Sequence, residues 1–284
     1  MQPKSFVPAA ALALMIVHSA AGAAGGAGPG GVRLAEQLAV YDLELVRATH
    51  RSGIVQARGR IAVSMSGGGC AGWTSEMRMV TEYVFRRRKA RLIDSRNTSW
   101  EAADGGAYRF VSARFDNGVK VKDLKLTARR GADGAVTVRF SRPAGRESRL
   151  PAGTLFPVQA TRRLILAARA GRRHLGFFTF EGFEDGRARF VSALIGAADG
   201  QGTPAAGALA GVASWPVALA YYPQGAGGGA QMPEYEISFR LYDNGVLDDL
   251  RLSYGDYALK GRLAKLRLGR REEACAARGA RDAK

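Results

Sequence analysis

Polar and apolar residues alternate along most of the chain from Leu38 onward, which is the pattern of half-buried β-strands. In the first run, Tyr41, Leu43 and Leu45 share one face and acidic residues separate them. Further strand-like runs lie at 55–65, 73–85, 90–100, 107–115, 119–128, 135–140, 174–183, 187–195, 215–222, 235–242, 246–254 and 257–268. Several are separated by Asn-Gly or Asp-Gly, which favour tight hairpins because Gly and Asn tolerate positive φ. The pattern predicts an all-β antiparallel meander.

One stretch has the pattern of a helix. It runs from Val158 to Ala170, with Pro157 near its first position and Gly171 just past its end. Its apolar face holds Thr161, Leu164, Ile165 and Ala168, and its other face holds Arg162 and Arg169. A single amphipathic helix in a β-rich chain is expected to cross or plug the sheet. A mobile gate is the alternative interpretation.

Two hairpins resemble each other. The segment from Tyr108 to Leu126 matches the segment from Tyr235 to Leu252, about 127 positions later, and both carry an Asp-Asn-Gly turn. Such an echo indicates a duplicated half of the chain. Convergence on a favourable hairpin sequence is the alternative, but the matching tyrosines and Leu-x-Leu pairs favour duplication.

The start of the chain has the three parts of a secretory signal peptide. These are Lys4, an apolar run from Phe6 to Val17, and small residues that end at Ala23. The run is shorter than the roughly 20 residues of a membrane anchor. We therefore expect a signal peptide over 1–23 that is cleaved near Ala23, a flexible lead-in over 24–37, one β-rich domain over 38–275 and a disordered tail over 276–284.

The sequence contains two cysteines, Cys70 and Cys275. Two cysteines allow one intramolecular pairing, and disulfides persist in the oxidising compartments that exported proteins reach. Such a bridge would close a loop of 206 residues and would stabilise the fold by at most about 5 kcal/mol. A reactive thiol pair is the alternative, but the sequence holds no Cys-x-x-Cys motif.

The chain is strongly basic. Its formal net charge is +17, from 42 Lys and Arg residues against 25 Asp and Glu residues. Export argues against a nucleic-acid partner, whereas attraction to lipid phosphates or anionic glycans stays open. The run from Arg86 to Lys89 is interpreted as a solvated turn or a charged sheet edge rather than a binding site.

Catalytic and cofactor motifs are absent from the sequence. His50 and His174 are the histidines outside the signal peptide, too few for a usual zinc site, and both are expected to be ordinary strand or loop residues. Asp248 and Asp249 are adjacent on a strand, so they should point to opposite faces. We expect no enzyme activity, no catalytic residue, no metal and no cofactor. Carboxylates that converge from distant segments are the open alternative.

Aromatic residues gather in the second half of the sequence. They are Phe177, Phe178, Phe180, Phe183, Trp215, Tyr221 and Tyr222. Curved sheets and partly open barrels enclose cavities, and these side chains could line one for an apolar ligand. Aromatic strand residues are more commonly plain core, and this is the interpretation we favour.

Several segments together resemble a known family. They are Ala-Val-Tyr-Asp-Leu at 39–43, Cys-Ala-Gly-Trp-Thr-Ser-Glu at 70–76, Leu-Pro-Ala-Gly-Thr-Leu-Phe-Pro at 150–157, Tyr-Asp-Asn-Gly-Val at 242–246 and the late Cys275. In these segments the sequence resembles the EipB cell-envelope-integrity family from about residue 38 to residue 275. The Cys-x-Gly-Trp and Leu-Pro-x-Gly-Thr-Leu-Phe-Pro pieces are the specific parts of the match.

The resemblance implies a periplasmic protein that supports envelope integrity and stress resistance. It implies a β-spiral, a strongly curved antiparallel sheet half closed around a central helix, and a disulfide between Cys70 and Cys275. It also implies a functional partner with tetratricopeptide repeats, and the fold is reminiscent of periplasmic lipoprotein carriers. No catalytic residue is carried over. The Gly/Ala-rich stretches at 196–213 and 225–230 are interpreted as insertions, so no partner contact is carried over near them.

We therefore expect a monomeric, non-enzymatic periplasmic factor that maintains the envelope by binding an envelope component or a protein partner. The alternative is a lipid or lipoprotein carrier that holds an acyl chain in the curved sheet.

Overall fold

The computed structural model describes residues 31–68, 71–198, 207–225 and 232–271. The first eight strands are β1 Ala35–Ala48, β2 Ile54–Gly67, β3 Trp73–Phe85, β4 Arg91–Glu101, β5 Ala107–Asp116, β6 Val119–Arg130, β7 Val136–Arg142 and β8 Ala144–Leu150. After helix α1, Pro157–Arg169, come β9 His174–Thr179, β10 Arg189–Ile195, the short 3-10 turn η2 Gly207–Leu209, β11 Ser214–Pro223, β12 Tyr235–Tyr242, β13 Leu247–Ser253 and β14 Tyr257–Arg271.

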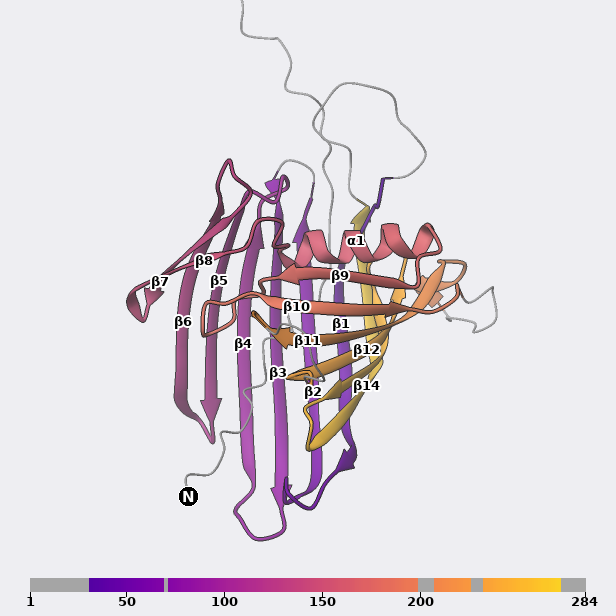
Figure 1. Ribbon diagram of the computed structural model, residues 1–284. Coiled ribbons are helices and arrows are strands. Elements are labelled where there is room, and N and C mark those ends of the chain that lie inside the picture. Colours follow the sequence, from indigo (N-terminus) through magenta and orange to yellow (C-terminus); the bar gives the residue numbers. More distant parts are fainter. Residues whose placement is uncertain (1–30, 69–70, 199–206, 226–231, 272–284) are drawn as a thin grey trace, which may run out of the picture.

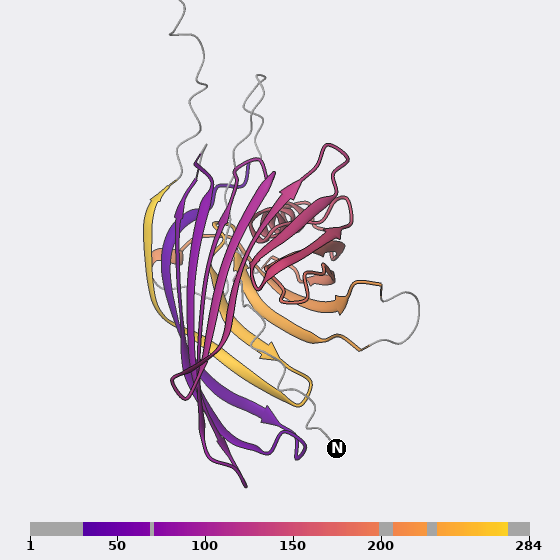
Figure 2. The same ribbon diagram turned by 90° about the vertical axis from the view of Figure 1, so that its left-hand side faces the viewer.

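All the strands in the described part of the chain belong to one antiparallel sheet. Its 14 strands follow the order β8-β7-β6-β5-β4-β3-β2-β1-β14-β13-β12-β11-β10-β9, so the first and last strands of the chain are neighbours inside the sheet. The sheet is open, and it curves strongly so that its two arms face each other (Figures 1 and 2). The predicted all-β fold, a half-open curved sheet with one helix, is confirmed.

The sheet is built on the predicted alternation. In β1 the inward side chains of Ala39, Tyr41 and Leu43 are buried, and the residues between them are more exposed. The strand begins at Ala35 rather than Leu38, and Val32 and Leu34 are also buried, so the end of the predicted flexible lead-in is part of the packed structure. The sequence pattern did not predict the first residues of β1, because the inward-facing position 37 holds a polar glutamine where the alternation calls for an apolar residue.

Helix α1 forms as predicted and packs on the concave side of the sheet (Figure 2). The residues of its predicted apolar face, Thr161, Leu164, Ile165 and Ala168, are all buried. At its C-terminal end, Arg169 forms two hydrogen bonds to Asp243 in the β12–β13 turn, at 2.6 and 2.8 Å. A cation near a helix C-terminus also interacts favourably with the helix dipole.

The two edges of the sheet come together near α1. The chain after β8 runs along β9, where Leu155 exchanges backbone hydrogen bonds with Phe178 and Phe180 at 2.8 and 2.9 Å. The hydroxyl of Ser148 in β8 donates to the carbonyl oxygen of Gly186, after β9, at 2.6 Å. Edge strands are thereby covered by the protein's own chain, which protects them from pairing with other molecules.

Candidate functional site

A buried carboxylate lies at the N-terminus of α1. Glu101, the last residue of β4, is 2% exposed, and its oxygens accept the backbone N–H groups of Val158 and Gln159 at 2.8 and 3.1 Å. The first N–H groups of a helix have no partner within the helix and carry partial positive charge. Glu101 satisfies two of these groups, so this helix N-terminus is occupied by the protein itself.

Arg130, the last residue of β6, fixes the same region. Its guanidinium donates to the carbonyl oxygens of Gly105, Gly134 and Thr154 and to Oε1 of Gln159. It also lies 5.3 Å from the centre of the Phe156 ring, just before α1. One planar cation therefore holds three turns and the start of the helix in place.

A second buried carboxylate, Glu181, lies after β9 and is 1% exposed. Its Oε1 accepts the hydroxyl of Tyr221 at 3.2 Å, and the Tyr221 ring stacks on Tyr235 with 4.3 Å between ring centres. Burial raises the pKa of Tyr108, and the charges of Glu181 and Glu101 raise it further. Tyr108 is thus coupled electrostatically to both buried carboxylates.

Burial also raises the pKa of Glu101 and of Glu181 to about 8 in each case. The hydrogen bonds from Val158 and Gln159 oppose this rise for Glu101, and the bond from Tyr221 and the charge of Arg189 oppose it for Glu181. Raised carboxyl pKa values are also found in general acids. Here both carboxyl groups bind structural partners, and neither lines the surface hollows described below. Their arrangement supports a structural role.

The raised pKa of Glu181 predicts a pH-dependent stability. Between its ordinary value of 4.5 and about 8, the folded state holds a proton that the unfolded state has lost, so stability falls as pH rises. The expected slope is up to about 1.4 kcal/mol per pH unit. In urea unfolding, Glu181→Gln should match the wild type near pH 5 and exceed it near pH 8. The exposed Glu147→Gln is the control, and parallel pH curves for wild type and Glu181→Gln would contradict the prediction.

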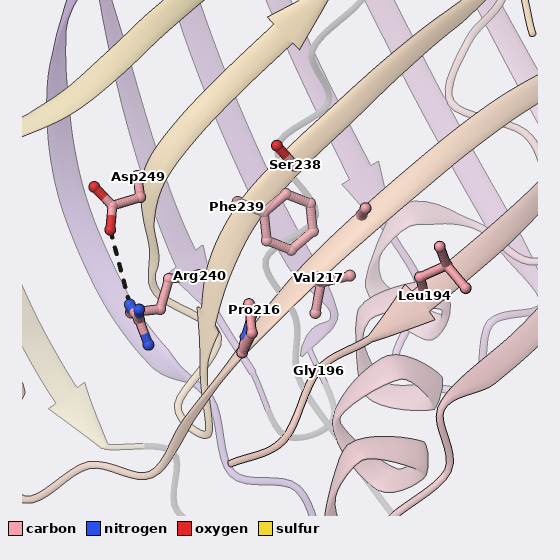
Figure 3. A pocket seen from close by; sticks show the side chains of 9 residues that line it. Leu194, Gly196, Pro216, Val217, Ser238, Phe239, Arg240 and Asp249 are labelled. Carbon is pink, nitrogen blue, oxygen red and sulfur yellow. Dashed lines mark ion pairs between the residues drawn. The ribbon is translucent and has the colours of Figure 1, made fainter. Parts of the chain in front are cut away.

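Two hollows lie side by side on the outer face of β10–β13, the face turned away from the core. Their volumes are about 350 and 400 Å³, and both are bordered by Leu194, Ala218 and Ser238. We call them together the outer groove, and Figure 3 shows the hollow that Arg240 and Asp249 border. The surface is hollowed in the middle of the groove because the paired residues there, Ala218 on β11 and Ser238 on β12, have small side chains. At one end, Arg240 pairs with Asp249 at 3.8 Å. Both hollows are open to the surface rather than enclosed.

The aromatic residues singled out in the sequence separate into two groups. Five belong to the core: Phe177, Phe180, Phe183, Trp215 and Tyr221. Phe178 is partly exposed and packs against Phe190 with 5.6 Å between ring centres, and Tyr222 borders one of the hollows of the outer groove. The preferred interpretation, plain core, is confirmed for the five buried residues.

The regular strand alternation on which the expectation for Asp248 and Asp249 rested is interrupted here. Asp249 has a positive φ of 49°, and the pairing of β12 with β13 shifts by one residue there, so the strand carries a bulge. Leu247 and Leu250 are both buried as a result, and the two aspartates between them are both outside the core. Asp248 accepts the backbone N–H of Asp249 at 2.7 Å, a local structural bond.

The remaining sequence candidates give no reactive centre. His50 and His174 are exposed, at a turn and at the start of β9. Cys70 and Cys275 lie outside the described residues. Within the described ranges, no three His, Cys, Asp or Glu side chains are placed to hold a metal ion. No helix in these ranges is both long and apolar enough to span a membrane.

Comparison with known proteins agrees with this architecture. The sequence model of EipB-like proteins matches residues 30–269. The chain belongs to the EipB-like family. A curated relative from Brucella abortus (strain 2308), named cell envelope integrity protein EipB, is 34% identical over 239 residues, which cover 83% of this chain and 84% of the relative. The resemblance inferred from the sequence motifs is thereby confirmed.

A solved structure shares the EipB-like fold. It is a crystal structure from Brucella abortus, described as a beta-barrel-like protein of a domain of unknown function. It superposes with a TM-score of 0.79 at 32% identity and covers 84% of this chain and 100% of that chain. The overall fold is therefore shared with an experimental structure.

Proposed function

We propose that the protein is a non-enzymatic periplasmic factor that maintains cell-envelope integrity by binding an envelope component or a protein partner. The relative named cell envelope integrity protein EipB supports the envelope role. One observation of the site favours binding over catalysis: the buried carboxylates bind the protein's own groups, whereas the described hollows open on an outer face that lacks them.

Export and a Cys70–Cys275 disulfide are part of the proposal. The signal-like sequence up to Ala23 supports secretion. Described residues that precede each cysteine in the sequence lie at the start of β1. Gly67, before Cys70, donates its N–H to Glu36 at 3.0 Å, and Arg271, before Cys275, pairs with Ala35. This convergence of distant segments supports a bridge that ties the beginning of the sheet to its end.

A lipid or lipoprotein carrier is the second candidate, and the outer groove favours it. The described hollows lie on the outer face, and there this candidate would hold an acyl chain. A tetratricopeptide-repeat partner and a monomeric state belong to the first candidate. The exported location supports partners other than nucleic acid.

The test combines genetics with native mass spectrometry. A strain that lacks the protein should become sensitive to detergent, and the wild-type gene should restore resistance. Ala218→Trp fills the outer groove and should fail to restore it, whereas Thr98→Trp, on the same outer face of the sheet in β4, should succeed. A deletion without an envelope defect, or fractionation with the cytoplasm, would contradict the proposed function.

Protein purified from its own periplasm separates the two candidates. A reproducible added mass that disappears on lipid extraction and is absent from Ala218→Trp would establish the carrier. An unmodified mass for both proteins would favour the factor that binds a protein partner, and partner capture from the periplasm would follow.

A further inference from the structure

Four turns lie together at the end of the sheet opposite α1, the lower end in Figure 1. They join β1 to β2, β3 to β4, β5 to β6 and β13 to β14. Backbone hydrogen bonds connect neighbouring turns: Thr49 donates to Asp256 at 2.8 Å, and Arg86 donates to Gly53 at 2.9 Å. We call segments 46–55, 86–90, 117–121 and 254–256 the basic rim. These bonds join 46–55 to 254–256 and to 86–90, and Asn117 donates to Leu92, at the start of β4 just past 86–90, at 2.9 Å.

The basic rim is strongly positive. Its segments contain seven Lys and Arg residues and one carboxylate, Asp256. Arg51, Arg86, Arg87 and Lys89 are exposed, and none of them forms an ion pair within the described residues.

The outer face of the sheet differs from the rim. There, cations have acidic neighbours across the strands, such as Arg60 with Asp42 at 2.7 Å and Arg78 with Asp94 at 2.9 Å. The charge of the rim is therefore concentrated, whereas much of the charge on the sheet face is neutralised locally.

Exposed aliphatic side chains accompany these cations. Val46, Val55, Val119 and Val121 are 40%, 49%, 66% and 51% exposed. Cations beside exposed aliphatic groups suit the surface of an anionic bilayer, because lipid phosphates attract the charges and the boundary of the acyl region accepts the apolar groups. A single-stranded nucleic acid would favour exposed aromatic rings for stacking, but Phe85, the aromatic residue beside the run of arginines, is buried.

We propose that the basic rim docks the protein on an anionic phospholipid surface. Several turns on one end of a single sheet can contact an extended surface at the same time, and their contributions add. Docking in this way holds α1 and the covered edges of the sheet away from the lipid. The inference does not depend on the proposed function, because it requires neither a ligand in the outer groove nor a protein partner.

Vesicle sedimentation with the mature protein tests the proposal. We expect binding to vesicles of phosphatidylcholine mixed equally with phosphatidylglycerol, weak binding to phosphatidylcholine alone, and loss of binding as salt increases. Replacing both Arg86 and Arg87 by serine should weaken partitioning about 25-fold, because each basic residue near an anionic surface contributes a factor of about five. Val119→Ser should weaken it less and equally at all salt concentrations.

The matched control replaces Arg172 and Arg173, exposed residues after α1, by serine. It removes the same charge from the other end of the protein and should leave vesicle binding nearly unchanged. Thermal unfolding of each variant shows that it is folded. Three outcomes would overturn the proposal. The two double variants could lose vesicle binding equally, or the wild type could bind neutral vesicles as well as anionic ones. The third outcome is binding to a soluble polyanion that depends on the basic rim, without binding to vesicles.

Discussion

Replacing Glu101 by alanine is expected to lower the free energy of unfolding by about 4 kcal/mol. The substitution leaves the N–H groups of Val158 and Gln159 without their acceptors at the start of α1 and opens a space in the core. Each unsatisfied buried group costs roughly 1–3 kcal/mol. Urea unfolding followed by circular dichroism measures the loss.

Two variants show whether the hydrogen bonds are responsible. At pH 5, well below the raised pKa of about 8, Glu101→Gln keeps one carbonyl oxygen as an acceptor and should lose only part of the stability. Glu76→Ala removes an exposed carboxylate of the outer face that accepts a long hydrogen bond from Ser64, at 3.4 Å, and should change stability by less than about 0.5 kcal/mol. A Glu101→Ala protein as stable as Glu76→Ala would contradict the role assigned to this carboxylate.

Gly182→Ala is expected to destabilise the fold by about 3–4 kcal/mol. Gly182 has a φ of +84°, which costs a residue with a side chain about 1–2 kcal/mol. A Cβ at this position would also overlap the buried ring of Phe110. The segment after β9 would have to move away from β5, and the covered edges of the sheet would loosen.

A matched glycine separates the two causes. Gly145 has nearly the same φ, +81°, but a Cβ there meets no atom within 4 Å. Gly145→Ala should therefore cost only about 1 kcal/mol. Thermal unfolding of both variants measures the difference, which reports the overlap with Phe110. Equal losses of stability in the two variants would show that the ring of Phe110 moves aside at little energetic cost.

Local patterns predicted most of the fold. The alternation around Tyr41 and the Pro157 start of the helix are short-range signals, and the structure confirms both. β8 was not predicted, because nearly all its residues are exposed on an edge and carry no alternation. The bulge at Asp249 was missed for a different reason: it depends on how β12 and β13 pair, which the sequence of one strand does not reveal.

The site was less predictable than the fold. Glu101 and the helix residues it binds lie 57 and 58 positions apart, so no local pattern connects them. The outer groove arises from small residues such as Ala218 and Ser238, which resemble ordinary strand residues in the sequence. The resemblance to the EipB family came from specific short motifs. It predicted the family correctly, whereas the chemistry of single residues did not indicate a function.

The position of β1 and β14 has a consequence for how the protein is made. The first and last strands pair in the interior of the sheet, across most of the length of the chain. Each arm is a local meander, but the pairing of β1 with β14, which joins the two arms, forms only after the final strand has been synthesised. Such non-local pairing slows folding, because the entropy of a long loop is lost before its contacts form. Until then β1 and β13 each present an unpaired edge, so the newly synthesised chain passes through a period in which it is open to aggregation.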